Sequence, residues 1–260
     1  MCGNKGKIDK EEAMLQWKDL IKKFQDAGLR CLTIDPVEGL PDMVFTANAG
    51  LIHPTEKRVL LTTFRYKERG GEEKHFEKWF SDHGYQICKI KNPDVCFFEG
   101  AGDALWCGST LVVGYGFRTN EGGAEQVADF IGGNVVFVKL VNENFYHLDT
   151  CFTGKIHNNV CLYYPSAFDW ESQKRIEHLP ADDIISVCRK DAERFVCNAV
   201  PAKQKIEDEW QDILITSEST PQLRWILEHE YEIVMTPVKT SEFLKAGGGA
   251  RCLTLFLHDN

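Results

Sequence analysis

The stretch "GDALWCGSTLVVGYG" at residues 102–116 contains two short apolar runs separated by a small, polar turn. Such runs on either side of a tight turn are typical of a β-hairpin. A stretch with helical composition follows at 121–132, and the apolar run "NVVFVKL" follows at 134–140. The order strand, strand, helix, strand predicts a ββαβ module.

Hairpin-like stretches of the same kind recur along the chain, each followed by a helix and an outer strand. They begin with a small or polar residue and return roughly every 40 to 60 residues, as in a degenerate repeat. Repeated modules could close into a ring around a central pocket; the alternative is an ordinary mixed sheet with accidental hairpins. Both are α/β, and because no Pro/Ser-rich linker interrupts the chain we expect a single domain over 1–260. The other hairpin-like stretches are 48–63, 150–165 and 198–217.

Apolar periodicity predicts the remaining elements. Residues 9–28 place Leu20 and Phe24 on one apolar face, which is typical of an amphipathic helix. Further helices are expected at 71–82, 121–132, 168–178, 205–210, 219–229 and 240–245. Apolar runs also predict strands at 30–35, 193–200 and 252–257.

Composition excludes several classes of protein. A net charge of −9 argues against a nucleic-acid partner, which would need clustered Lys and Arg. No apolar run approaches the ~18 residues of a membrane helix, and the N-terminus has no apolar leader. The ten cysteines therefore indicate reduced thiols and a cytoplasmic location, and the absence of CxxC or clustered His indicates no metal site.

Three stretches place ionisable or amide side chains among aromatic and apolar residues. Taken one at a time each has an ordinary explanation: a carboxylate after glycine in a turn, or a hydrogen-bonded core histidine. Buried ionisable groups are costly unless they are paired, so three such stretches together favour one shared polar pocket. If His147 and Asp149 lie in a strand they point to the same face. The stretches are "PDMVFTANAG" (41–50), "FFEGAGDALW" (97–106) and "NFYHLDTCF" (144–152).

A cysteine, Cys252, follows three glycines in "AGGGARCLTLFL" (246–257). Most cysteines in such a place are core residues, but the glycines suggest that another segment or a ligand packs against the main chain here. A thiol, a histidine and carboxylates together suggest nucleophilic catalysis. Nearby carboxylates raise the pKa of a thiol and so disfavour the thiolate. A cationic substrate would offset their charge and favour the thiolate. A guanidinium meets that requirement, because carboxylates bind its planar N–H groups bidentately.

These motifs, together with "ERGGEE" (68–73), "GFRTN" (116–120) and "GGGARCLTL" (247–255), resemble those of the guanidino-group-modifying enzymes of the pentein fold. That family includes arginine deiminase, dimethylarginine dimethylaminohydrolase, the amidinotransferases and the arginine dihydrolases. The resemblance spans about residues 30 to 257. It implies a five-bladed α/β propeller of ββαβ modules, in agreement with the repeat.

The resemblance also implies roles for individual residues. Cys252 resembles the nucleophile that attacks the guanidinium carbon. His147 resembles the general acid/base, and Glu99 resembles the carboxylate that grips the guanidinium and orients His147. The implied substrate-binding residues are Asp149 for the guanidinium, Arg69 and Arg118 for the substrate α-carboxylate, and Asn48.

Two features depart from the usual family pattern. Deiminases and dimethylaminohydrolases carry aspartate where this chain has Asn48, and the "FTANAG" form resembles the arginine dihydrolases. An amide can donate to a ureido oxygen as well as accept from a guanidinium, whereas a carboxylate can only accept. Family members also have a strand before the first helix, so either this strand is absent, with one blade incomplete, or the chain is truncated.

The sequence therefore predicts a cofactor-independent and metal-independent hydrolase that acts on the guanidino group of arginine or a close derivative. A covalent thiouronium on Cys252 would lead to ornithine, ammonia and carbon dioxide. Three alternatives stay open: a dimethylarginine dimethylaminohydrolase, an amidinotransferase, and a catalytically impaired arginine-binding module.

Overall fold

A computed structural model describes residues 7–156, 160–206 and 209–257. Its contacts divide the chain into two compact units, each made of separate stretches of sequence. The first unit contains 1–33, 149–165 and 181–251, and the second contains 34–148, 166–180 and 252–260. The expectation of one domain over the whole chain stays a prediction.

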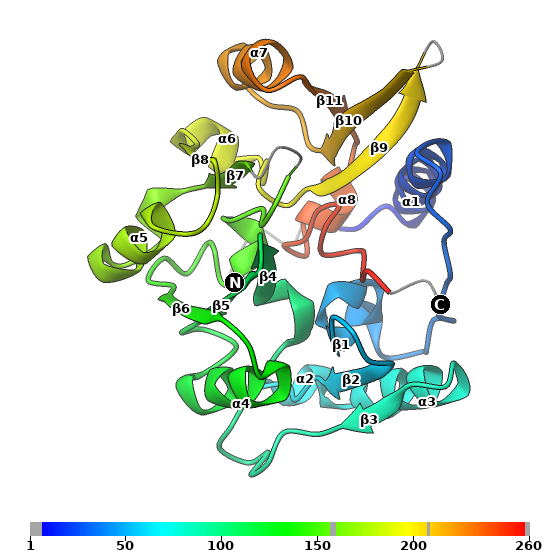
Figure 1. The fold of residues 1–260 in the computed structure, drawn as a ribbon. Helices are drawn as coiled ribbons and strands as arrows, with labels where there is room; N and C mark the ends of the chain where they lie inside the picture. The colour runs from blue at the N-terminus through cyan, green and yellow to red at the C-terminus, as the bar shows by residue number, and fades with distance from the viewer. Residues whose placement is uncertain (1–6, 157–159, 207–208, 258–260) are drawn as a thin grey trace. The chain divides into compact units, whose positions relative to one another are not determined.

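Two ββαβ modules form the second unit, as Figure 1 shows. In each, two strands pair antiparallel, a helix follows, and a third strand joins parallel to the second. The helix packs on its own sheet: α3 on β2 and β3, and α4 on β5. The modules comprise β1 (Gly50–Ile52), β2 (Arg58–Leu61), α2 (Lys67–Gly70), α3 (Glu73–Asp82) and β3 (Gln86–Cys88), then β4 (Ala104–Cys107), β5 (Thr110–Tyr115), α4 (Glu121–Ile131) and β6 (Val135–Lys139), with α5 (Trp170–Glu177) after them.

The first unit contains a third complete module. Strands β9 and β10 pair antiparallel, and β11 joins parallel to β10 after α7. A smaller sheet pairs β7 with β8 in parallel, and an isolated bridge from Phe152 to Tyr163 takes the place of a hairpin partner. Its elements are α1 (Lys10–Asp26), β7 (Val160–Tyr163), β8 (Asp183–Ser186), α6 (Arg189–Glu193), β9 (Val200–Ile206), β10 (Glu209–Thr216), α7 (Pro221–Glu230), β11 (Ile233–Pro237) and α8 (Ser241–Leu244).

The mixed α/β class and the ββαβ repeat are thus confirmed. The described residues form four small sheets, and the five-bladed propeller stays a prediction. The expected absence of a strand before the first helix falls largely on residues 1–6, which lie outside the described residues. The helix itself begins where the sequence predicts, because the Asp9 side chain accepts hydrogen bonds from the backbone N–H groups of Glu11 and Glu12.

Four predicted elements are wrong. Within 205–210, expected to be helical, the described residues 205–206 and 209–210 lie in β9 and β10, and Ile206 pairs with Glu209. Strand pairing there overrides a helix-favouring composition. The residues of the expected strands at 30–35 and 252–257 lie in no strand. Within 193–200, Glu193 ends α6 and turns follow until β9 begins at Val200. An apolar run becomes a strand only beside a partner strand, and this condition cannot be read locally.

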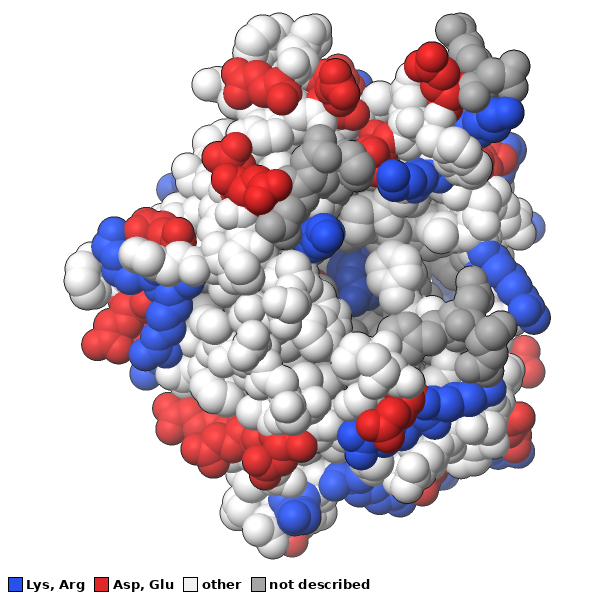
Figure 2. All heavy atoms as spheres, in the orientation of Figure 1, with Lys and Arg blue, Asp and Glu red and all other residues white. Residues whose placement is uncertain are grey.

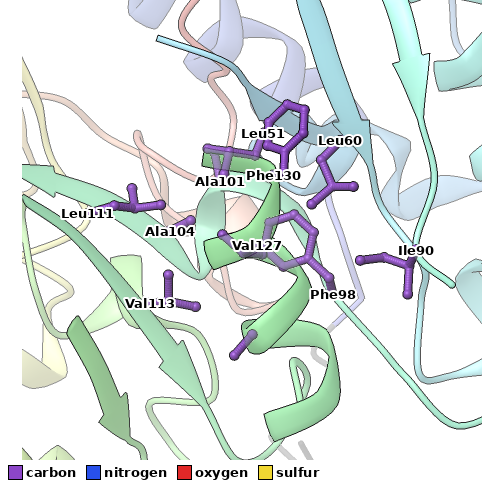
Figure 3. Packing of buried hydrophobic residues seen from close by; sticks show 11 residues of the cluster. Leu51, Leu60, Ile90, Phe98, Ala101, Ala104, Leu111, Val113, Val127 and Phe130 are labelled. Carbon is purple, nitrogen blue, oxygen red and sulfur yellow. The ribbon is translucent and has the colours of Figure 1, made fainter. Parts of the chain in front are cut away.

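A hydrophobic cluster joins the two sheets of the second unit (Figure 3). Leu51 and Leu60 come from the first sheet, Leu111 and Val113 come from the second, and Phe98 lies between them, fully buried. Helix α4 adds further apolar side chains to the same cluster. Burying apolar surface stabilises a fold by about 25 cal/mol per Å². The cluster therefore holds the segments that precede and follow Phe98 in place.

Gly100 allows two of those segments to approach closely. Its φ is +73°, and a Cβ at this position would lie 2.7 Å from the Ala47 carbonyl oxygen and 2.8 Å from Asn48 Cα. Both are backbone atoms, which cannot rotate away. Glycine is required here for conformation and for space.

We predict that Gly100→Ala destabilises the chain by roughly 2 kcal/mol or more, because backbone strain and a backbone clash add together. Urea unfolding measures this. Gly132→Ala is the matched control, since Gly132 also has a positive φ (+65°) but nothing lies within 4 Å of its added Cβ. That control should cost only about 1 kcal/mol; equal losses in the two variants would show that the close approach is unimportant.

The charged side chains on the face drawn in Figure 2 lie in small groups of both signs, not in one continuous basic patch. In the described part of the chain, every helix is too short or too polar to cross a membrane. None of the nine described cysteines forms a disulfide.

Candidate active site

His147 is buried between two carboxylates in the second unit. Its Nδ1 lies 3.0 Å from Asp103 Oδ2, and its Nε2 lies 3.4 Å from Glu99 Oε2. Only 3% of His147 and at most 1% of either acid is exposed. An imidazolium can donate one N–H to each carboxylate, so this arrangement favours the charged ring.

Asp103 orients the ring. Its Oδ1 accepts from the backbone N–H of Leu148 at 3.0 Å, and its Oδ2 also accepts from the hydroxyl of Thr119 at 2.7 Å. These contacts hold the carboxylate on both oxygens. A carboxylate held in this way fixes which imidazole nitrogen faces the rest of the site.

The segment that carries His147 is not the predicted strand. Residues Leu148–Thr150 form a short 3₁₀ helix, started by the hydrogen bond from Leu148 N–H to Asp103. The expectation that His147 and Asp149 share a strand face is therefore wrong. Asp149 belongs to the first unit, where its backbone carbonyl accepts from Asn198 Nδ2 at 3.0 Å.

Glu99 is completely buried. Besides His147, its carboxylate contacts Arg65 and Arg118. Its Oε1 accepts from the backbone N–H of Arg65 at 3.2 Å, and its Oε2 accepts from Arg118 Nη1 at 3.0 Å. The bridge between Thr63 and Phe98 places the segment, because it ends one residue before Glu99. Glu99 thus lies beside His147, and its expected roles of gripping a guanidinium and orienting His147 stay predictions.

The electrostatics follow from these contacts. Burial alone lowers the pKa of His147, but the charge and hydrogen bond of Asp103, together with Glu99, outweigh burial and raise it to about 9. Burial raises the pKa of Glu99, but the hydrogen bond and charge of His147 and the charge of Arg118 lower it to about 2. At neutral pH, His147 is therefore a cation between anions and can supply a proton.

Both arginines that were expected to hold a substrate carboxylate already have partners. Arg118 pairs with Glu99, and its guanidinium lies between the rings of Tyr66 and Tyr146, at 4.9 and 4.7 Å from their centres. Arg69 is buried and pairs with Glu72. Their role toward a substrate stays a prediction.

Asn48 lies beside this cluster. Its Nδ2 donates to the backbone carbonyl of Glu99 at 2.7 Å, and its Oδ1 accepts from Arg69 Nη1 at 2.9 Å. The carbonyl of Cys252 accepts from Ala47 N–H at 3.1 Å, so the candidate nucleophile lies next to the Asn48 segment. Cys252 is 5% exposed and lies in a turn, not at the start of a strand.

The glycines before Cys252 do allow another segment to pack against the main chain. The Asn198 side-chain oxygen accepts from the N–H groups of Gly249 and Arg251 at 3.1 and 2.9 Å. A Cβ on Gly249 would lie 2.9 Å from that oxygen. The stretch is held by a side-chain amide within the first unit.

The sequence analysis gave no role to several residues of this site. It left Asp103 open between a turn carboxylate and a member of the shared polar pocket, four residues after Glu99 in the quoted motif. Thr119, which follows Arg118, accepts from Glu99 N–H at 3.1 Å and donates to Asp103. Glu72 stands in the quoted "ERGGEE" stretch. Asp103, Thr119 and Glu72 all stand inside the quoted motifs, and this position was the one sequence signal that could have marked them as site residues.

A family model for the eukaryotic N,N-dimethylarginine dimethylhydrolases matches residues 1–258. This chain belongs to that family. The resemblance seen in the sequence motifs is therefore confirmed.

Individual members sharpen the comparison. The bifunctional arginine dihydrolase/ornithine cyclodeaminase ArgZ of Synechocystis is 41% identical over 259 residues, which cover 98% of this chain but 34% of ArgZ. This chain thus spans about a third of that relative. The N(G),N(G)-dimethylarginine dimethylaminohydrolase of Mycobacterium tuberculosis is 33% identical over 251 residues, covering 96% of this chain and 78% of that protein.

One solved structure is informative about chemistry. It is the N-terminal domain of ArgZ, in an asparagine-to-serine variant covalently bonded to a reaction intermediate. It matches this family member with a TM-score of 0.88 at 38% identity, covering 98% of this chain and 91% of that one. The mixed α/β fold is common to both.

We predict that the free energy of unfolding falls as pH rises from about 6.5 to about 9, because the folded chain holds a proton on His147 that the unfolded chain releases near 6.5. The His147 contribution is complete below pH 6.5 and disappears above about 9, a loss on the order of 3 kcal/mol. Urea unfolding of the native chain and of His147→Gln across this range measures the effect. If the two curves stay parallel, folding does not raise the pKa of His147.

Proposed function

We propose that this family member hydrolyses the guanidino group of L-arginine through a cysteine thiolate and releases ornithine, ammonia and carbon dioxide. The observation that carries the proposal is the buried set of Asp103, His147 and Glu99 beside the neutral amide of Asn48. The names of its relatives support it: ArgZ is an arginine dihydrolase, and a variant of its N-terminal domain forms a covalent intermediate.

In the first half-reaction, Glu99 binds the substrate guanidinium, and the Cys252 thiolate attacks its central carbon. The electron pair of one C–N bond leaves with the departing nitrogen, which takes a proton from His147 and goes as ammonia. The product is a thiouronium on Cys252. The raised pKa of His147 suits this step, because the proton is present at neutral pH.

In the second half-reaction, neutral His147 takes a proton from water, and the water oxygen attacks the thiouronium carbon. The C–S bond breaks to return the thiolate and give citrulline. A second attack on the ureido carbon and a second hydrolysis release ornithine. In total, arginine and two waters give ornithine, two ammonia and one carbon dioxide.

Asp103 acts through the ring and not on the substrate, so we assign it a positioning role. Asp149 remains a predicted second ligand of the guanidinium, and Arg69 and Arg118 remain predicted ligands of the substrate carboxylate. To bind the substrate carboxylate, the Arg118 guanidinium would have to contact it in addition to Glu99 or break its ion pair with Glu99. We also infer a five-bladed propeller, supported by the three complete ββαβ modules and by the likeness to the ArgZ domain.

A second candidate is hydrolysis of dimethylated arginine to citrulline and dimethylamine. It is favoured by the description of the family and by the mycobacterial relative. The same nucleophile and acid would serve, with space for the methyl groups. Rates with arginine and with dimethylarginine distinguish the two substrates.

The first test incubates the purified chain with L-arginine and quantifies ornithine, citrulline and ammonia. We expect ornithine with about two ammonia for each arginine consumed, and no turnover by Cys252→Ala, which lacks the nucleophile. Isothermal titration should still detect arginine binding to that variant. Citrulline alone would indicate a deiminase, and tight binding of arginine without product by the native chain would indicate a binding module.

We predict that Asn48→Asp shifts the products from ornithine toward citrulline by about tenfold or more, since a carboxylate cannot donate to the ureido oxygen of bound citrulline. The new oxygen would also replace Nδ2, which lies 2.7 Å from the Glu99 carbonyl oxygen. Product ratios at matched arginine consumption measure the change. An unaltered ratio would show that the amide does not select the product.

A further inference from the structure

Arg69 forms a buried ion pair with Glu72, a residue to which the mechanism above gives no role. Arg69 Nε donates to Glu72 Oε1 at 2.9 Å, and Nη2 donates to Oε2 at 2.7 Å. The two side chains are 6% and 1% exposed. A two-point contact of this kind fixes the plane of the guanidinium as well as its position.

The remaining contacts commit most of the guanidinium. Nη2 also donates to the Asp42 carbonyl at 3.0 Å, Nη1 donates to Asn48 Oδ1 at 2.9 Å, and the face of the group lies 4.3 Å from the centre of the Phe64 ring. These bonds use four of the five N–H groups that an arginine carries. One N–H, on Nη1, is left for another acceptor.

The contact with Arg69 decides which way the Asn48 amide faces. Oδ1 meets a donor on Arg69, and Nδ2 meets an acceptor, the Glu99 carbonyl. A flipped amide would set donor against donor and acceptor against acceptor. Held in this orientation, Asn48 has one further N–H, because the bond to Glu99 uses only one of the two on Nδ2.

On these contacts, and resting on the proposed function, we propose that Glu72 is a positioning residue that sets how much arginine continues past citrulline to ornithine. Glu72 fixes Arg69, and Arg69 fixes the Asn48 amide with an N–H available to the neutral ureido oxygen. If the Asn48 amide loses this orientation, the attack on the ureido carbon of citrulline slows more than the attack on the guanidinium carbon of arginine. The first attack acts on a cation that Glu99 still attracts.

The amide variant Glu72→Gln tests this directly. Glutamine can accept from only one of the two Arg69 donors and would place its own NH₂ against the other. Arg69 is then free to rotate, and the amide of Asn48 loses its fixed partner. Arg69→Lys should act alike, because lysine keeps the charge without the planar, two-point contact.

The experiment measures the ornithine-to-citrulline ratio from L-arginine, and separately the rate of ornithine formation from added L-citrulline. We expect Glu72→Gln and Arg69→Lys to lower the ratio by about tenfold or more, as small misplacements of positioned groups do. Arginine consumption should fall less than citrulline consumption. Glu72→Asp, which keeps the carboxylate, should restore part of the ratio.

The matched control is Glu68→Gln, which removes a carboxylate from an exposed position four residues away. Its product ratio should equal that of the native chain. A merely structural role for Glu72 predicts equal losses in both hydrolysis steps and an unchanged ratio, and that result would overturn the inference. If Glu72→Gln does not fold, Glu72→Asp and Arg69→Lys decide the matter by the same ratio.

Failure of the proposed function gives a different result. A native chain that forms no ornithine from arginine overturns the dihydrolase assignment before any variant is made, and Glu72 then has no product ratio to set. A native chain that forms ornithine, with the Glu72 and Arg69 variants retaining its product ratio, overturns the role of Glu72 alone.

Discussion

A completely buried carboxylate, Glu99, determines how the site is built. An unpaired charge in such a place is costly, and three neighbouring segments supply donors to this carboxylate. Arg118 and His147 supply cationic donors to the side chain, and Arg65 supplies a backbone N–H. The backbone of the same residue also binds Thr119 and Asn48. The chain around Glu99 therefore cannot move without breaking several bonds at once.

The position of Asn48 illustrates how closely chemistry and packing are joined here. Its segment can approach Glu99 only because residue 100 has no side chain. Its amide can face the Glu99 carbonyl only with nitrogen on that side, and Arg69 holds the opposite side. An aspartate in the same setting would bring two acceptor oxygens together. The choice between amide and carboxylate is thus constrained by the surrounding backbone as well as by the substrate.

Charge in the candidate site is balanced within the protein. The pairing of Arg118 with Glu99 places a guanidinium beside the carboxylate that is proposed to bind the substrate guanidinium. Two tyrosine rings stabilise that placement. His147, with its pKa raised to about 9, keeps its proton until a reaction removes it. The site is therefore prepared for proton donation, and the thiolate chemistry must be driven by the arriving cation.

The sequence by itself determined the ββαβ repeat and most of the helices, and it pointed to a shared polar pocket with Glu99 and His147, because hydrophobic periodicity and costly ionisable groups are local signals. It could not determine that 252–257 lacks a strand or that residues 205–206 and 209–210 lie in paired strands, because strand pairing depends on partners elsewhere in the chain. It also gave no orientation for the Asn48 amide and no role for Asp103, Thr119 or Glu72. These were decided only by tertiary structure, since a hydrogen bond between residues 20 to 50 positions apart depends on where the folded backbone places each donor and acceptor.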